Sequence, residues 1–419
     1  MKWKKYWKTL GPGLTTGAAD DDPSGIATYS QVGAARGFSL AWLAPFSLPL
    51  LGVAQEMSAR IGLVTGVGLA TNIKRHHSRQ ALYACTTLLL VANTFNIGAN
   101  LGAMAEVSKL VYPFLSFPMM VISFALFSLI LQVFVSYKNY AKYLKYLALS
   151  LFAYIFSAFA LDISWGEVLR SVVVPTVNFS KEEIILICAV LGTTISPYLF
   201  FWQSSQEVEE EILRGEVTEE ERRGKATKED IKDMRVDVWS GMFMSNLVMF
   251  FIIVTSSVTL FQNGITNINT AADAAEALRP IAGNFAFLLF ALGIIGTGLL
   301  SIPVLAGSAS YAVSESFGWK EGLFQKFKQA SAFYGVLIVA MIIGIMLNFV
   351  GLNPIKALIY SAVINGIVSP IILYFIVSLS SREDVMGEHK NRVLGNIFGW
   401  ATVGIMCLVS AFAIIFILV

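Results

Sequence analysis

The stretch GAADDDPSG, residues 17–25, places three consecutive aspartates directly before a proline inside an otherwise apolar segment. A charged side chain at membrane depth costs at least ~2.5 kcal/mol even on lenient insertion scales. The proline removes a backbone donor and disfavours helix at the residue before it. Because loose backbone is tolerated in a bilayer only where it is buried in protein or lines a cavity, the stretch predicts a broken membrane helix with a polar function.

The composition of the chain is that of an integral membrane protein. Its 419 residues are 56% hydrophobic and only 14% charged, whereas soluble domains carry about 25% charged residues. The net charge of +2 gives no reason to expect a nucleic-acid partner. The cysteines Cys85, Cys188 and Cys407 lie far apart without metal-site spacing, and we expect them to be small buried hydrophobic residues.

Apolar runs long enough to cross a bilayer, about 20 residues each, recur along the whole chain. We count eleven, near residues 11–34, 38–60, 81–108, 113–135, 144–161, 183–203, 237–261, 281–311, 331–349, 355–379 and 394–418. With the N-terminus inside, 24 of the 30 Lys and Arg residues fall at inner segments. This asymmetry predicts a cytoplasmic N-terminus and an outer C-terminus.

Two of the predicted spans, the first and the sixth, contain a proline flanked by small polar residues, at Pro23 and Pro197. Kinked packing helices are the simpler explanation, but broken helices five spans apart are typical of an inverted repeat that binds substrate at the midplane. We therefore expect one all-α membrane domain, 1–419, with repeats at about 10–161 and 182–379 and an extra helix at about 394–418.

The two breaks would form a site rich in oxygen. The aspartates attract a cation, and hydroxyls or carbonyls can come from the residues Ser24, Thr193, Thr194 and Ser196. Since neither break contains Cys, His or Met, the pattern favours Mg²⁺, Mn²⁺ or Ca²⁺ over soft metals. The metal would be the transported substrate, and no cofactor is expected.

Further polar residues lie on other predicted helices. Asn93, Asn96 and Asn100 share one helix face because they are spaced by three and four residues. They could line a hydrated path, together with Asn365, or form interhelical hydrogen bonds. Asp237 stands at the start of the seventh predicted span, and we expect it to cap that helix.

The start GPGLTTGAADDDPSG and the sixth-span stretch GTTISPY carry a resemblance to the Nramp family of divalent metal transporters, as does LLSIPVLAGSASYAVSESFGW in the eighth span. The resemblance covers nearly the whole chain and implies a LeuT-like fold of eleven helices with helices 1 and 6 broken. It places the family's metal-binding aspartate on Asp22. The family's Ala-x-x-Met-Pro-His motif falls on residues 193–198.

The chain departs from the family pattern at several positions. Gly25 replaces an asparagine, Ser196 the methionine, Tyr198 the histidine and Ala362 a glutamine, while Asn96 and Ala99 stand where helix 3 has its acidic pair. The arginines of helix 9 are absent as well. The departures resemble those of the Nramp-related magnesium transporters, and imply a roomier oxygen-only site and loss of proton coupling.

These expectations combine into one functional prediction with alternatives. The chain is expected to move Mg²⁺ and Mn²⁺ without proton coupling, by alternating access. The ion would contact Asp22, Ser24, Gly25, Thr193 and Ser196, and its pathway would include Asp21, Asn96, Asn100, Tyr198 and Asn365. The expected surroundings are the lipid bilayer, most simply a bacterial inner membrane, without an obligate protein partner.

The alternatives belong to other classes. The first is a proton-coupled Mn²⁺/Fe²⁺ importer of the same family. An organic-cation or amino-acid transporter of the same fold is the second, although three aspartates would repel an amino acid's carboxylate. An enzyme is not expected, because the chain has no His-Glu-x-x-His run, and a sensor that keeps the site without transport remains open.

Overall fold

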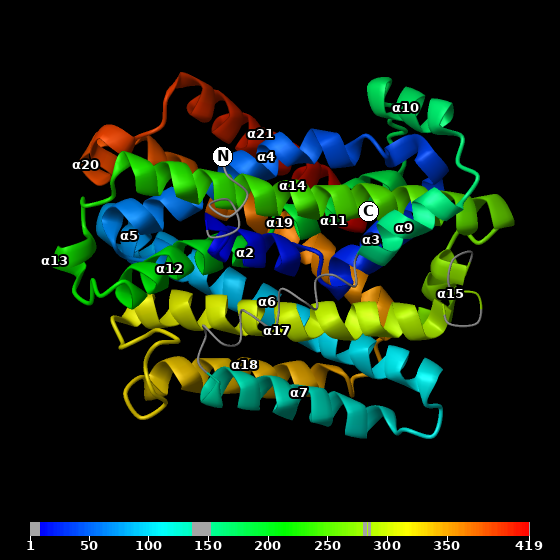
Figure 1. Cartoon of the computed structure of the whole chain (residues 1–419), viewed down its shortest axis with the longest axis horizontal. Coiled ribbons are helices and arrows are strands. Elements are labelled where there is room, and N and C mark those ends of the chain that lie inside the picture. The colour runs from blue at the N-terminus through cyan, green and yellow to red at the C-terminus, as the bar shows by residue number, and fades with distance from the viewer. Residues whose placement is uncertain (1–8, 136–151, 280–282, 284–285, 419) are drawn as a thin grey trace.

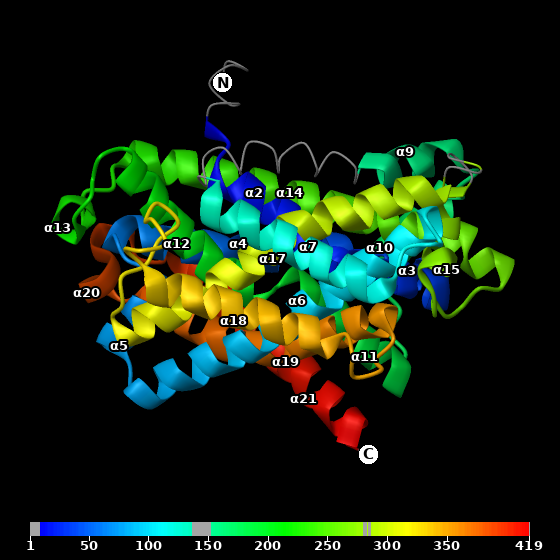
Figure 2. The same ribbon diagram turned by 90° about the horizontal axis from the view of Figure 1, so that it is seen from below.

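The structure, a computed structural model, describes residues 9–135, 152–279, 283 and 286–418, and within these ranges it contains helices and no strands. Most helices run along the long axis of the molecule, which is horizontal in Figures 1 and 2. The long helices are α4 (Leu43–Thr65), α6 (Arg79–Val111), α7 (Phe117–Phe134), α14 (Lys228–Thr259), α17 (Ala286–Phe317), α18 (Ser331–Leu347), α19 (Pro354–Ser381) and α21 (Val393–Leu418).

Short helices connect these elements. They are η1 (Gly37–Leu40), α5 (Leu69–His76), α9 (Phe152–Ala160), α10 (Trp165–Val173), α13 (Glu219–Arg222), η3 (Phe261–Asn263), α15 (Ala271–Ala275), η4 (Glu276–Leu278), α20 (Glu383–Met386) and η6 (Gly387–His389). In Figure 1, α5, α13 and α20 lie at one end of the molecule and α15 lies at the other. Arg75 in α5 donates hydrogen bonds of 2.5 and 2.8 Å to Glu219 in α13, which lowers the pKa of that carboxyl.

Two membrane helices are broken where the sequence predicts. The first consists of the half-helices α2 (Pro12–Asp20) and α3 (Pro23–Arg36). The second consists of the half-helices α11 (Lys181–Thr194) and α12 (Pro197–Leu213). Each second half begins with a proline, which has no N–H to leave unpaired at a helix start. The predicted breaks at Pro23 and Pro197 are therefore confirmed.

The number of spans differs from the count made on sequence. In the described part of the chain, seven spans are long and apolar enough to cross a membrane when α11 and α12 are counted together as one. The number is eight if α3 and α4, bent by 110°, also count as one. α18 has only 17 residues, and the predicted span 144–161 lies partly outside the described residues. The prediction of a multi-span helical bundle is confirmed, whereas the number eleven is not.

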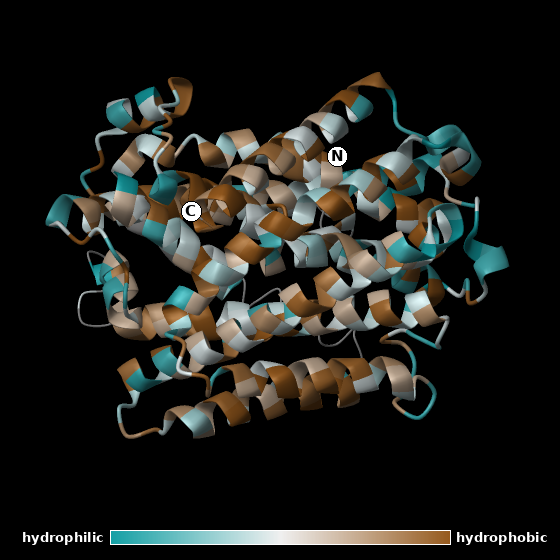
Figure 3. Ribbon diagram, turned by 180° about the vertical axis from the view of Figure 1, so that it is seen from behind, coloured by the Kyte–Doolittle hydropathy of each residue, from teal (hydrophilic) through white to brown (hydrophobic). Residues whose placement is uncertain are grey.

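Apolar residues dominate the middle of the bundle, and polar residues gather towards its ends, most clearly around α13 and α20 (Figure 3). The main buried cluster draws on nearly every long helix. Its largest side chains include Trp202, Tyr29 and Tyr198, all almost completely shielded. The core therefore surrounds both broken helices.

The first half-helix, α2, packs backbone to backbone against α14. A Cβ atom on Gly17 would lie 2.3 Å from the carbonyl oxygen of Gly241, and one on Gly241 would lie 2.1 Å from the carbonyl oxygen of Gly13. These distances leave no room for a side chain. Glycine is required at these positions because the two helices approach so closely.

We therefore expect Gly17→Val to lower the melting temperature of the detergent-solubilised protein. The added side chain would force α2 away from α14, and overpacking of this kind costs ~1–3 kcal/mol or more. Gly335→Ala in α18 is the matched control, because no atom lies within 4 Å of its added Cβ. The melting temperatures are measured by tryptophan fluorescence. Equal values for the two variants would contradict the close contact.

Candidate metal site

The carboxylate of Asp22 lies at the break between α2 and α3 and accepts four hydrogen bonds. Its Oδ1 atom accepts from the Ser24 hydroxyl at 2.5 Å and from the Gly25 N–H at 2.9 Å. Its Oδ2 atom accepts from the side-chain amides of Asn96 at 3.2 Å and Asn100 at 3.1 Å. Asp22 thus caps α3 with one oxygen and faces α6 with the other.

The break between α11 and α12 lies against the same point. The Ser24 Oγ atom is 3.3 Å from Thr193 Oγ1, which places the end of α11 beside Asp22. Ser196, the residue before the proline, donates its hydroxyl hydrogen to the carbonyl oxygens of Gly192 at 2.7 Å and Thr193 at 2.6 Å. The structure therefore brings Ser24 and Thr193 next to Asp22, while the hydroxyl hydrogen of Ser196 is held by the end of α11.

Gly25 lies where a side chain would touch both breaks. A Cβ atom there would be 3.3 Å from the Asp20 carbonyl oxygen and from the Tyr29 ring, and 3.4 Å from Thr193 Oγ1. These are tight contacts, so a larger residue would press on its neighbours. Glycine keeps the backbone of the first break close to the second.

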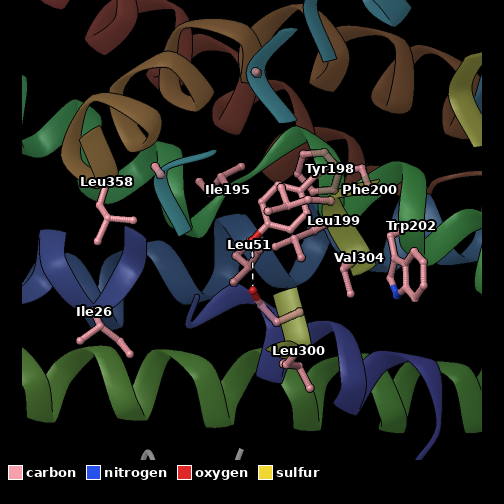
Figure 4. Packing of buried hydrophobic residues seen from close by; sticks show 14 of the residues in the cluster. Ile26, Leu51, Ile195, Tyr198, Leu199, Phe200, Trp202, Leu300, Val304 and Leu358 are labelled. Carbon is pink, nitrogen blue, oxygen red and sulfur yellow. Dashed lines mark hydrogen bonds between the residues drawn. The ribbon is translucent and has the colours of Figure 1, made fainter. Parts of the chain in front are cut away.

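Two tyrosines join the halves of the broken helices. The Tyr198 hydroxyl of α12 donates to the Ala19 carbonyl of α2 at 3.0 Å, and the hydroxyls of Tyr29 in α3 and Thr194 in α11 are 3.1 Å apart. Tyr198 lies in the buried cluster that also contains Leu51 (Figure 4). Asp22 is 0% and Thr193 is 1% exposed, so the site is closed on both sides in this conformation.

On the α2 side, polar contacts hold the closed arrangement. Thr16 donates to Gln203 of α12 at 2.6 Å. The Asp237 carboxylate of α14 accepts from the N–H groups of Gly11 at 2.8 Å, Gly13 at 2.6 Å and Leu14 at 3.0 Å. The expectation that Asp237 caps its own helix is wrong, because α14 begins nine residues earlier, at Lys228, and Asp237 caps α2 instead.

The three consecutive acids point to different neighbours. Asp20 accepts a short hydrogen bond from the Ser245 hydroxyl of α14, and Asp21 accepts from the same hydroxyl at 3.4 Å. Within the described ranges, none of the three aspartates forms an ion pair with a Lys, Arg or His. The same ranges contain no cluster of three His, Cys, Asp or Glu side chains that could hold a metal ion. Asp21, a predicted pathway residue, thus faces α14, away from the α6 amides.

Asn365 and Ala362 lie on α19 beside the second break. Asn365 is buried, and neither atom of its side-chain amide has a hydrogen-bond partner among the described residues. One turn on, Ser369 donates to the Ile195 carbonyl within the break. A Cβ on Gly192 would lie 2.2 Å from the Ala362 carbonyl oxygen, so α11 and α19 are in close contact here.

Several residues of the site could not be found from the sequence. Ser301 of α17 lies 3.1 Å from the Asn100 amide, and Ser245 of α14 binds Asp20. A single serine in an apolar helix is too common to signal a site. Asp237 was visible as a charge, but its true partners lie 223 to 226 residues away in the sequence.

Comparisons with known proteins identify the family to which this chain belongs. The family model described as natural resistance-associated macrophage protein-like, or Nramp, matches residues 13–416. The chain belongs to the Nramp family. It is 22% identical over 401 residues to the divalent metal cation transporter MntH of Caldanaerobacter subterraneus, covering 95% of this chain and 90% of that one. MntH of Klebsiella pneumoniae is 23% identical over 408 residues, with 97% and 93% covered.

Solved structures show the same fold. The manganese transporter of Eremococcus coleocola aligns with a TM-score of 0.73 at 18% identity, covering 97% of this Nramp chain and 86% of that one. MhsT in complex with L-phenylalanine aligns with a TM-score of 0.60 at 13% identity, covering 97% and 98%. The LeuT-like transporter fold is confirmed, and the Nramp relatives are metal transporters and not enzymes, as predicted.

The contact between Asp237 and α2 can be tested by thiol labelling. Thr16 is fully buried, so in a Cys407→Ser background the substitution Thr16→Cys should react slowly with a membrane-impermeant reagent. Adding Asp237→Ala removes three hydrogen bonds to a charged group, worth ~1.5–3 kcal/mol each. We expect the labelling rate to rise by at least tenfold, a factor that corresponds to about 1.4 kcal/mol and so to the loss of roughly one such bond.

Asp230→Ala is the control for this experiment. It removes an acid from the same helix, but Asp230 bonds to Thr227 and Arg214 and not to α2. Its labelling rate should equal that of the background. An unchanged rate in the Asp237 variant would mean that the carboxylate does not hold α2 closed.

Proposed function

We propose that this chain is a secondary transporter that carries Mg²⁺ and Mn²⁺ across the membrane, without proton coupling, by alternating access around Asp22. The observation that carries the proposal is the position of Asp22, a buried carboxylate where two broken helices meet. Its hydrogen-bond partners are a hydroxyl, a backbone N–H and two amides. The carboxylate, the hydroxyl and the carbonyl oxygens of the two amides are hard ligands, which suit Mg²⁺ and Mn²⁺.

The proposed ligands follow from the geometry around Asp22. Asp22 supplies the charge, Ser24 and Thr193 supply hydroxyl oxygens, and Ser196, buried at the second break, would supply a further oxygen. Gly25 keeps this region free of a side chain. The printed names of the relatives, divalent metal cation transporter and manganese transporter, support a divalent ion as the substrate.

The absence of proton coupling is proposed from two positions. Tyr198, in place of the family's histidine, uses its hydroxyl to hold the Ala19 carbonyl. Asn96, in place of an acid, has an amide that cannot carry a proton. Without protons, inward flow of a divalent ion would be driven by its gradient and by the membrane potential, worth about 4.6 kcal/mol per 100 mV for two charges.

Proton-coupled uptake of Mn²⁺ or Fe²⁺ is the second candidate. It is favoured by Asp20 and Asp21, two buried carboxylates beside Asp22 that form no ion pair among the described residues. Transport of an organic cation or an amino acid has less support. MhsT shares the fold at 13% identity, and the charge of Asp22 would repel the carboxylate of an amino acid.

The placement in the membrane is part of the proposal. The distribution of Lys and Arg supports a cytoplasmic N-terminus and an outer C-terminus, and the MntH relatives come from bacteria. A bacterial inner membrane is the simplest location. The proposed repeats span about 10–161 and 182–379, with one break in each and an extra helix at about 394–418. Asn365 of the second repeat would lie along the ion pathway.

A liposome experiment tests the proposal. Entry of Mg²⁺ and Mn²⁺ is followed by separate fluorescent reporters, together with an internal pH dye. We expect both metals to enter without acidification, and Asp22→Ala to abolish entry. Asp162→Ala, a change to an exposed acid, should leave entry unchanged. Acidification with Mn²⁺ and no entry of Mg²⁺ would establish the proton-coupled alternative.

Metal preference is expected to respond to position 196. Ser196→Met would add a thioether, a soft ligand, beside Asp22 and raise uptake of Cd²⁺ relative to Mg²⁺. Ser196→Leu is the control, because leucine has similar bulk and no sulfur. The measurement is the ratio of Cd²⁺ to Mg²⁺ uptake in liposomes, and equal ratios in the two variants would remove the role assigned to the missing thioether.

A further inference from the structure

The three asparagines on one face of α6 have different surroundings. The Asn93 amide donates to the Leu305 carbonyl at 2.9 Å and to the Ser308 hydroxyl at 2.8 Å, so it joins α6 to α17. The Asn96 and Asn100 amides donate instead to the same oxygen of Asp22. Only two of the three residues therefore belong to the site.

The carbonyl oxygens of these two amides have no partners. Asn96 and Asn100 are each 0% exposed, and the Oδ1 atom of each lacks a hydrogen bond within the described part of the chain. The Oδ1 atom of Asn93 lacks one as well, but the Asn93 amide bonds to α17 and not to Asp22. Buried acceptors of this kind are uncommon in native proteins, and each calls for an explanation. Both oxygens belong to side chains whose other end already touches the proposed metal ligand.

We propose that Asn96 and Asn100 are direct ligands of the transported divalent ion, and that each amide turns over when the ion joins Asp22. The inference rests on the proposed function and adds the residues that recognise the ion. A cation on the Oδ2 atom of Asp22 would repel the two N–H groups that now point at it. A half-turn about the last side-chain bond exchanges the nitrogen for the carbonyl oxygen, because the two ends of an amide have nearly the same size.

Ser301 can form a hydrogen bond with the Asn100 side-chain amide in either of its two orientations. It now lies 3.1 Å from the Asn100 nitrogen and accepts its hydrogen. After the half-turn, the serine hydroxyl can donate to the carbonyl oxygen at the same place, because a hydroxyl both donates and accepts. The exchange therefore needs no movement of α6 or α17.

The resulting ligand set has a definite chemistry. One carboxylate and two neutral amide oxygens are hard ligands, and they leave part of the ion's double charge uncompensated. Such a site would select a hard divalent cation and release it readily. An acid at either amide position would hold the ion more tightly, which works against release.

The test measures Mg²⁺ and Mn²⁺ binding to the full chain in lipid nanodiscs by calorimetry. Asn96→Leu and Asn100→Leu keep the approximate shape and remove the ligand, and each should weaken binding by about tenfold or more. Asn93→Leu is the matched control on the same helix face. It should leave binding within about twofold of the parent value, although it lowers the melting temperature by removing two hydrogen bonds.

Infrared difference spectroscopy of the unmodified sequence avoids any effect of substitution on folding. With ¹³C-labelled asparagine, addition of Mg²⁺ should shift side-chain carbonyl bands, and the shift should be smaller in the Asn96 and Asn100 variants. Metal binding without a shift would overturn the inference and leave the proposed function standing. Binding that survives Asp22→Ala would instead overturn the proposed function itself.

Discussion

The hydrogen bond from the Gly25 N–H to the Asp22 carboxylate is the contact on which the site depends. Breaking a helix inside a membrane leaves backbone donors that water cannot reach. Pro23 removes one such donor, and one oxygen of Asp22 satisfies another. The second oxygen is thereby held in a fixed direction, facing α6. A single side chain both stabilises the break and presents a negative charge to the centre of the bundle.

Both halves of the first broken helix pack closely against α14, since a Cβ atom on Gly33 of α3 would lie 2.5 Å from the Ile253 carbonyl oxygen, but their hydrogen-bond partners on the second broken helix differ. Asp237 and the close glycine contacts hold α2 on α14, and Thr16 joins it to α12. Tyr29 joins α3 to α11 instead. The halves therefore share α14, and each forms its own hydrogen bond to one half of the second broken helix.

The sequence was sufficient to predict features that depend only on residues close together in the chain. The prolines located both breaks, and the helical period put Asn93, Asn96 and Asn100 on one face. All three form interhelical hydrogen bonds, Asn93 to α17 and the other two to Asp22, while the hydrated path stays a prediction. Asp237 was misassigned because its partners come from a half-helix more than 220 residues earlier. The span count differed because the first break divides one apolar run, because α18 is short, and because the predicted span 144–161 lies partly outside the described residues.

The break also explains how three acids can stand together at membrane depth. Asp20 ends α2 and Asp21 follows it, so both lie at the negative end of a helix dipole. Asp22 precedes α3 and lies at a positive end, where the dipole favours a carboxylate. The same run of residues therefore contains one acid whose carboxylate accepts four hydrogen bonds and two acids that share the hydroxyl of Ser245. Asp22 is for this reason the acid suited to hold a metal ion, while its two neighbours depend on Ser245 and on any further positive charge that enters the site.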